Sequence, residues 1–257
     1  DLAHAFLLPP SIWSLIALRS FGAKDRPKLI TSERNSVIAS SLQERWLQSI
    51  AYRGADAVTV NAETVASEIV QKLSVSEDRI SYIPNGIDLS RWDQQMARPA
   101  RIEFSPEFFH IALVGRLTPQ KNAPLLIRAL ARLPRETRGR LRVWLIGRND
   151  GQTAAEIARQ IKASGLSEIV ATWPAEREIA PIMAALGAVV LPARYEGFPN
   201  VVLEAMAAAT PVVATPVGDV PNLGEHGHTG LLVPTNDERA LADAILWLLG
   251  ASPDALR

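Results

Sequence analysis

Short apolar runs alternate with amphipathic stretches along the chain, and this alternation restricts the possible folds more than any other feature. The runs are rich in valine, isoleucine and leucine and end at glycine, proline or polar residues, as strands buried on both faces do. Strands that alternate with helices favour a parallel sheet covered by helices, so we expect an α/β fold. The ten expected strands cover residues 2–8, 28–31, 57–61, 80–83, 111–115, 143–147, 169–172, 188–192, 211–214 and 230–233.

The stretches between these runs carry the spacing of amphipathic helices. The clearest helical patterns cover residues 11–21, 122–133 and 238–249. Asn122 is the expected N-cap of the second of these helices, with Pro124 in its first turn. In the first helix we expect Trp13, Ile16 and Leu18 on or near one face.

One interval lacks this alternation of strand-like and helical stretches. Residues 88–109 contain prolines and several charges but no clear period, which is typical of a connection between domains. We therefore predict a first α/β domain over residues 1–90, a linker over 91–106 and a second α/β domain over 107–257.

The composition excludes several classes of protein. The chain has no cysteine, so thiol catalysis, cysteine-ligated zinc and iron–sulfur clusters are impossible. Its 27 basic and 27 acidic residues cancel, whereas a general nucleic-acid binder is expected to be basic, so we expect no nucleic-acid partner. No apolar run approaches the roughly 20 residues that span a bilayer.

The segment around the first helix leaves two interpretations open. Four large apolar residues stand near four basic ones, namely Trp13, Leu15, Ile16 and Phe21 near Arg19, Lys24, Arg26 and Lys28. A packed core helix is the interpretation that we favour. Peripheral contact with anionic lipid is the alternative.

Common nucleotide and hydrolase motifs are absent from the sequence. It contains no G-x-G-x-x-G, no G-x-x-x-x-G-K-S/T, no G-x-S-x-G and no D-x-D. These absences argue against the usual dinucleotide motif, P-loop enzymes, serine hydrolases and metal-bridged diphosphate chemistry. His226 and His228 lie between glycines, so we interpret them as turn residues rather than metal ligands.

The turn after the strand at 111–115 has the features of an anion site. Gly115 permits a close backbone approach where the strand ends, and a helix follows the turn. Arg116 and Lys121 flank the turn, and a diphosphate would suit a planar guanidinium together with a mobile ammonium. Taken alone, the two residues are equally well explained as ordinary loop cations.

A second constellation follows the strand at 188–192, at the end of the strand where open α/β sheets bind ligands. Glu196 and Gly197 stand in the loop, and Pro199 is typical of the first turn of the next helix. Glu204 falls about one turn into that helix, where a carboxylate can accept hydrogen bonds from vicinal hydroxyls. Alternatively, each glutamate simply complements the helix dipole.

Together these motifs resemble the group 1, or family four, retaining glycosyltransferases, which use nucleotide sugars. Glu196 and Glu204 have the Glu-x7-Glu spacing of that family. Five further stretches resemble it in the same order, at residues 1–4 (DLAH), 83–88 (IPNGID), 115–122, 211–215 (PVVAT) and 229–234 (TGLLVP). The ordered set covers nearly the whole chain.

The resemblance implies two Rossmann-like, doubly wound domains of the GT-B type facing a cleft, with the donor held mainly by the second. It implies that Arg116 and Lys121 bind the donor diphosphate and act in catalysis. It also implies that Glu204 binds the ribose and that Glu196 contacts the transferred sugar as a catalytic residue. The donor-binding residues that it implies are Gly115, Arg116, Lys121, Gly197, Phe198, Pro199, Asn200 and Glu204. Neither a metal nor a cofactor is expected.

The sequence departs from the family pattern at several points. The first domain lacks its expected first strand and glycine-rich loop, and the family's final helix is missing after Arg257. We therefore expect a truncated chain, with an incomplete first domain, that binds nucleotide but transfers sugar poorly. His4 matches a structural position and is a candidate sugar contact, because Phe6 stands where many members carry a histidine.

The leading function is transfer of a sugar from a nucleotide diphosphate sugar to an acceptor hydroxyl. The family implies retention, UDP rather than GDP on prevalence, a carbohydrate or lipid-linked acceptor, and a cytoplasmic role in polysaccharide or glycolipid synthesis. One alternative is a nucleotide-binding fragment without turnover. Another is a glycoside hydrolase with Glu196 and Glu204 as its carboxylate pair, which fits less well because the two lie in a loop and in the following helix.

Overall fold

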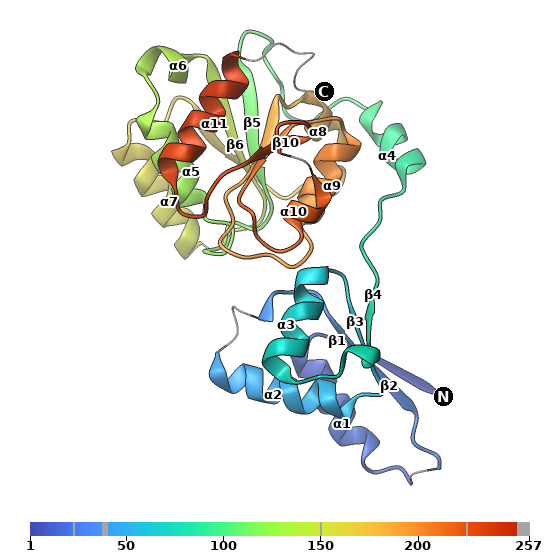
Figure 1. Cartoon of the computed structure of the whole chain (residues 1–257). Helices are drawn as coiled ribbons and strands as arrows, with labels where there is room; N and C mark the ends of the chain where they lie inside the picture. The colour runs from blue at the N-terminus through green and yellow to red at the C-terminus, as the bar shows by residue number, and fades with distance from the viewer. Residues whose placement is uncertain (23, 38–40, 150, 225, 251–257) are drawn as a thin grey trace. The chain divides into compact units, whose positions relative to one another are not determined.

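The computed structural model describes residues 1–22, 24–37, 41–149, 151–224 and 226–250 (Figure 1). Contacts divide the chain into two compact units. The first comprises residues 1–85 and 195–198, and the second comprises residues 86–194 and 199–257. Each unit is built on its own parallel sheet, so the chain is a two-domain α/β protein.

The first unit contains a four-stranded sheet in the order β1-β2-β3-β4, with every pair parallel. Its strands are β1 (Leu2–Phe6), β2 (Lys28–Glu33), β3 (Ala57–Val60) and β4 (Ile80–Tyr82). They are joined by α1 (Leu8–Leu18), α2 (Leu42–Gly54), α3 (Glu63–Leu73) and the 3-10 turn η2 (Glu77–Arg79). Because each right-handed crossover leads to the next strand in the same direction, the three helices cover one face of the sheet (Figure 1).

Helix α1 begins earlier than the sequence predicts. Leu7 adopts a φ of 66°, which turns the chain sharply out of β1. A proline stands in the first turn of α1, where its missing N–H group would have no partner in any case. The strand predicted over residues 2–8 therefore ends at Phe6, because the apolar run continues through the turn into the helix.

The predicted apolar face of this helix is also wrong. Leu15 and Leu18 are buried, whereas Trp13 and Ile16 are 70% and 50% exposed. The sequence period shows that the apolar residues recur with helical spacing, but not which of them meet the sheet. Contact with β1 and β2 decides this, and it turns Leu15 and Leu18 inward.

A buried carboxylate stabilises the turn at the end of β2 through hydrogen bonds. Glu33 is 3% exposed and accepts hydrogen bonds from the N–H groups of Arg34 and Asn35 at 2.8 and 3.0 Å. Its second oxygen accepts from the hydroxyl of Tyr52 at 2.5 Å and from Nε2 of Gln48 at 3.3 Å. Burial and the charge of Glu33 raise the pKa of Tyr52, so the phenol remains a donor. The network fixes the turn after β2 to helix α2.

The second unit contains a six-stranded parallel sheet in the order β10-β9-β8-β5-β6-β7, which is doubly wound because it grows in both directions from β5. Its strands are β5 (Phe109–Val114), β6 (Leu141–Ile146), β7 (Val170–Trp173), β8 (Ala188–Leu191), β9 (Val212–Ala214) and β10 (Gly230–Leu232). Its helices are α4 (Leu89–Met96), α5 (Ala123–Arg132), α6 (Arg135–Gly139), α7 (Gln152–Ala163), α8 (Ala180–Ala185), α9 (Asn200–Ala207), α10 (Val220–Leu223) and α11 (Glu238–Gly250). All ten predicted strands are therefore present in sequence order. Within the described ranges, no helix is both long enough and apolar enough to cross a membrane.

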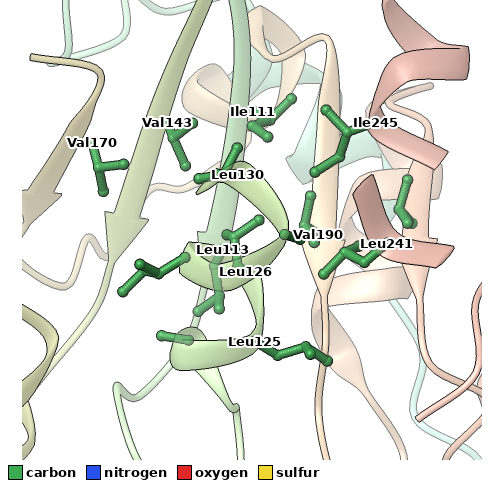
Figure 2. Close-up of a cluster of buried hydrophobic side chains, with 14 of the residues drawn as sticks. Ile111, Leu113, Leu125, Leu126, Leu130, Val143, Val170, Val190, Leu241 and Ile245 are labelled. Atoms are coloured by element: carbon green, nitrogen blue, oxygen red, sulfur yellow. The ribbon is translucent and has the colours of Figure 1, made fainter. Parts of the chain in front are cut away.

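The core of the second unit fixes β5 at the centre of the sheet. Ile111 and Leu113 of β5 lie against Leu126 and Leu130 of α5, and Ile245 of α11 joins the same cluster (Figure 2). All five are buried completely or almost so. Burial of one such side chain stabilises the fold by about 1.5–3 kcal/mol, so this cluster holds the turn that follows β5 in place.

The interval at 88–109 contains a helix that the sequence period does not reveal. Asp88 caps α4 by accepting a hydrogen bond from the N–H of Arg91 at 3.0 Å. Trp92 is 7% exposed and packs into an apolar cluster of the second unit. Polar residues outnumber apolar ones in this short helix, so no stripe stands out. The two units meet in sequence after Asn85.

Candidate functional site

The strand order reverses between β5 and β8, and ligands of open α/β sheets bind at the carboxyl ends of strands at such a point. Gly115 directly follows β5 and has a φ of 141°, a conformation that residues with side chains rarely adopt. A Cβ on Gly115 would lie 3.2 Å from Cε of Lys121, so the lysine stem lies over this backbone. The N–H of Arg194, after β8, donates to the carbonyl of Gln120 at 2.9 Å and ties the two turns together.

The turn after β6 packs against the turn after β5. Gly147 has a φ of 151°, and a Cβ there would lie only 1.8 Å from the carbonyl oxygen of Gly115. The N–H of Leu117 donates to the carbonyl of Arg148 at 2.8 Å. The two glycines therefore let the turns touch, and they place Arg116 and Arg148 at neighbouring strand ends.

An open pocket of about 370 Å³ lies at the carboxyl ends of β5, β6 and β7. Among the residues that line it are Gly115, Arg116, Gly147, Arg148, Arg177 and Glu204. Its volume is in the range of small-molecule sites. Every lining residue belongs to the second unit, so the pocket is a feature of that unit alone.

The pocket carries an excess of positive charge. Among the described residues, no carboxylate pairs with the guanidinium of Arg116, Arg148 or Arg177. Glu176 also lines the pocket, but its carboxylate already accepts a hydrogen bond from the indole N–H of Trp173 at 3.0 Å. Several positive charges around one pocket attract an anion, and guanidinium groups bind phosphate oxygens in a bidentate manner.

One carboxylate stands among these cations. Glu204 projects from α9 and lines the pocket. Burial raises the pKa of Glu204, and the positive charge of Lys121 partly offsets this. A carboxylate in this position accepts hydrogen bonds from hydroxyl groups. The arrangement therefore offers cations for a phosphate-like group and one acceptor for hydroxyls.

The structure brings four of the predicted site residues together. Gly115, Arg116 and Glu204 line the pocket, and Lys121 lies over the backbone of Gly115. Glu204 is in the second turn of α9, close to the predicted position. These four residues belong to the connections and the helix that follow two neighbouring strands of the sheet, β5 and β8.

The other predicted residues of the β8–α9 connection divide between the units. Pro199 is the N-cap residue of α9 and Asn200 is its first residue, both in the second unit. Glu196, Gly197 and Phe198 group with the first unit. Glu196 and Phe198 are buried. The pocket of the second unit is thus formed without these three residues.

Two of the cations that line the pocket were not predicted from the sequence. Arg148 follows Gly147 at the end of β6, as Arg116 follows Gly115 at the end of β5. This repeated Gly-Arg pair at neighbouring strand ends is the signal that could have revealed Arg148. Arg177 stands in the loop after β7, and no pattern in the sequence marks it.

His4 lies on β1 of the first unit and is exposed. Its Nε2 lies 2.8 Å from Oγ of Ser32, and its ring centroid lies 4.4 Å from that of Phe6. These contacts hold the ring on the surface of the sheet. His4 is not among the residues of the pocket.

Asn122 precedes α5, as predicted, but its side chain does not cap the helix. Its backbone is left-handed, with a φ of 54°, and this conformation does not direct the side chain at the first turn. Nδ2 of Asn122 instead donates to Oδ1 of Asn236 at 3.3 Å. Pro124 does stand in the first turn.

His226 pairs with Gly230 across the turn at residues 227–229, and His228 lies in that turn, as the sequence predicts. Nδ1 of His226 accepts a hydrogen bond from the N–H of Leu232 at 3.0 Å. Over the ranges that the structure describes, no three His, Asp or Glu side chains gather in a way that could hold a metal ion.

Two family descriptions match the chain. The family described as glycosyl transferases group 1 matches residues 109–251, which is more than half of the chain. The family described as glycosyltransferase family 4 matches residues 1–91. The first match contains every residue of the pocket.

Similar proteins include D-inositol 3-phosphate glycosyltransferases of two bacteria. That of Nocardia farcinica is 34% identical over 206 residues, which cover 76% of this chain and 45% of the relative. That of Kribbella flavida is 34% identical over 203 residues, which cover 74% of this chain and 47% of the relative. The chain spans about half the length of the curated relatives that it matches.

Solved structures share the fold of the whole chain. Anabaena HepE, in complex with UDP and glucose, gives a TM-score of 0.85 at 23% identity, covering 100% of this chain and 70% of that one. Sucrose-phosphate synthase from Thermosynechococcus elongatus gives a TM-score of 0.79 at 25% identity. The match covers 100% of this chain and 66% of the synthase. The fold is accordingly that of the two-domain GT-B glycosyltransferases. The chain belongs to the group 1 glycosyltransferases.

Proposed function

We propose that this protein transfers a sugar from a nucleotide diphosphate sugar to a hydroxyl group of an acceptor. The observation that carries the proposal is the pocket of the second unit, in which Arg116 and Arg148 line the same space as Glu204. A nucleotide diphosphate needs cations for its phosphates and an acceptor for its ribose hydroxyls. Membership of the group 1 family supports the same function.

The reaction exchanges one bond of the anomeric carbon for another. The bond to the diphosphate oxygen breaks, the bond to the acceptor oxygen forms, and the acceptor hydroxyl releases its proton to water. The diphosphate leaves with an additional negative charge. Arg116, Lys121 and Arg148 would stabilise that charge, because fixed cations act strongly where water is excluded. We propose that these cations make a metal unnecessary.

The roles of the individual residues follow the family resemblance. Glu204 would bind the ribose hydroxyls, and its place beside Lys121 supports this role. Glu196 would contact the transferred sugar together with the backbone of Gly197 and Phe198. The Glu-x7-Glu spacing supports both assignments. Retention of configuration at the anomeric carbon is part of the proposal and rests on the resemblance alone.

We propose a UDP-sugar as the donor and a carbohydrate or lipid-linked hydroxyl compound as the acceptor. Anabaena HepE, which shares the fold, is solved with UDP, with UDP and glucose, and with UDP-glucose. The curated relatives are named for D-inositol 3-phosphate, which is a hydroxyl-rich acceptor. These names support the chemical class of both substrates.

A thermal-shift screen with UDP, GDP, ADP and UDP-glucose in the presence of EDTA tests this proposal. A ligand that binds only the folded state raises the Tm. We expect UDP and UDP-glucose to raise the Tm most, and Arg116→Gln to remove the shift. Arg159→Gln is the matched control, because Arg159 pairs with Glu156 on α7. No shift with any nucleotide would contradict the proposal.

Release of UDP from UDP-glucose separates transfer from its alternatives. Release that depends on an added acceptor, such as an inositol phosphate or a simple glycoside, supports a transferase. The same rate without an acceptor indicates hydrolysis. Binding without any release indicates a nucleotide-binding protein and rejects the transferase.

A further inference from the structure

Helix α2 turns an apolar stripe away from the core. Leu42, Trp46 and Ile50 recur at every fourth position and are 79%, 64% and 37% exposed. The buried residues of the helix, among them Ala51 and Tyr52, lie on the opposite side. An amphipathic helix normally points its apolar stripe at the core and leaves the other side polar. The outward stripe of α2 therefore needs an explanation other than packing within the described chain.

Helix α1 adds to the same surface. Trp13 and Ile16 point away from the buried Leu15 and Leu18, and Phe21, just after the helix, is 50% exposed. Helices α1 and α2 pack against each other on one side of the sheet (Figure 1). Their exposed residues form what is here named the α1–α2 patch, consisting of Trp13, Ile16, Phe21, Leu42, Trp46 and Ile50. Single exposed apolar residues are ordinary, but a gathered set marks an interaction surface.

Basic residues follow the exposed apolar residues of both helices in the sequence. Arg53 continues the outward side of α2, and Arg19 and Lys24 follow α1. All three are exposed, and none pairs with a carboxylate among the described residues. Two acidic residues belong to the same segments. Glu44 takes part in the capping box that begins α2, and Asp25 follows Lys24 in the sequence. The two segments that carry the patch are therefore positive on balance.

We propose that the α1–α2 patch docks the protein on a membrane surface that contains anionic lipid. Tryptophan favours the boundary between headgroups and acyl chains, where the other apolar side chains can also be buried. Lysine and arginine at this depth meet the lipid phosphates. A second copy of the chain fits less well, because a two-fold interface would bring the same cations together.

This docking surface goes beyond the proposed function and does not depend on the donor pocket, which belongs to the other unit. It would bring a lipid-linked acceptor to the enzyme, whereas a water-soluble acceptor would gain nothing from it. Loss of membrane binding and loss of nucleotide binding are therefore separate outcomes that different measurements detect.

Co-sedimentation of the full chain with phospholipid vesicles tests the proposal. We expect binding to vesicles of phosphatidylcholine mixed with phosphatidylglycerol and much weaker binding to phosphatidylcholine alone. A basic residue near an anionic surface contributes about fivefold in affinity, so Lys24→Gln and Arg53→Gln should each weaken binding by about that factor. These two changes touch only exposed side chains, so they are not expected to disturb folding.

The tryptophans give a second test. Trp13→Ser combined with Trp46→Ser should weaken vesicle binding at least about tenfold, because each indole loses its apolar burial. The matched control is Trp247→Ser, since Trp247 is 47% exposed on α11 of the other unit. The control should bind vesicles like the wild type. All variants should unfold at nearly the same Tm as the wild type, which shows that they are folded.

Three results would overturn the proposal. One is no binding of the wild type to either kind of vesicle. Another is that the wild type binds equally well to vesicles with and without anionic lipid and that the tryptophan variant binds as well as the wild type. The third is a dimer in analytical ultracentrifugation that the tryptophan changes dissociate, because the patch would then belong to a second copy of the chain.

Discussion

The carbonyl oxygen of Gly115 lies 1.8 Å from the point where a Cβ on Gly147 would stand. No side chain fits into that space, and the φ of 151° at Gly147 disfavours one as well. The contact joins the turns after β5 and β6 and places Arg116 and Arg148 at neighbouring strand ends. The shape of the pocket at these strand ends therefore depends on two glycines that have no functional side chain.

Gly147→Ala should disrupt this contact. Overpacking at a rigid backbone position should lower the free energy of unfolding by about 3 kcal/mol and remove UDP binding. Urea denaturation and calorimetry measure the two effects. The control is Gly139→Ala, because a Cβ on Gly139 would meet nothing within 4 Å. If both variants were as stable as the wild type, the close approach of the two turns would be wrong.

The cations of the pocket should act on the phosphates. Arg116→Ala, Lys121→Ala and Arg148→Gln should each weaken UDP binding by roughly 10- to 150-fold, because a hydrogen bond to a charged group contributes about 1.5–3 kcal/mol. Uridine, which lacks phosphates, should lose far less. Calorimetric titration of both ligands measures the difference. Equal losses for uridine and UDP would remove these residues from the phosphate site.

The two glutamates should behave differently. Glu204→Ala should weaken binding of UDP itself, because Glu204 lines the pocket and would bind the ribose. Glu196→Ala should leave UDP binding nearly intact and lower the rate of sugar transfer. Calorimetry with UDP and a UDP-release assay separate the two effects. Loss of UDP binding in Glu196→Ala, together with intact binding in Glu204→Ala, would reverse the assignment.

Glu204 should also make stability depend on pH. Burial raises its pKa above the ordinary value of 4.5. Between 4.5 and the raised value, the folded protein holds a proton that the unfolded chain has lost, so stability falls as pH rises through this window.

Glutamine does not titrate, so Glu204→Gln should abolish this decrease in stability with rising pH. Urea denaturation of both proteins at mildly acidic and at neutral pH should show a smaller pH dependence in the variant. Parallel curves for the two proteins would show that the carboxyl is not perturbed in the folded state.

Much of the fold could be predicted because its strands are buried on both faces. Runs such as 111–115 and 188–192 are almost wholly apolar, and a glycine, a proline or a polar residue ends each of them. The limits of elements were harder to predict. The first strand merges with α1 through a turn at Leu7, and α4 has too few apolar residues to show a period.

Part of the site could be predicted from position alone. Gly115, Arg116 and Glu204 follow strands directly or within one connection, and such positions form sites in α/β sheets. Arg148 was missed because its importance depends on contact between two turns that are far apart in the sequence. The outward direction of Trp13 was missed because helical spacing does not show which side meets the sheet.

The proposed function requires that a nucleotide diphosphate binds at the carboxyl ends of β5 and β6 in the second unit. Titration of the isotope-labelled chain with UDP, followed by two-dimensional NMR of the amide groups, locates the site directly. The largest shifts should occur at the amides of Gly115, Arg116, Gly147 and Arg148, and uridine should shift them far less. Shifts confined to other parts of the chain, or no shifts at saturating UDP, would show that UDP does not bind at these strand ends.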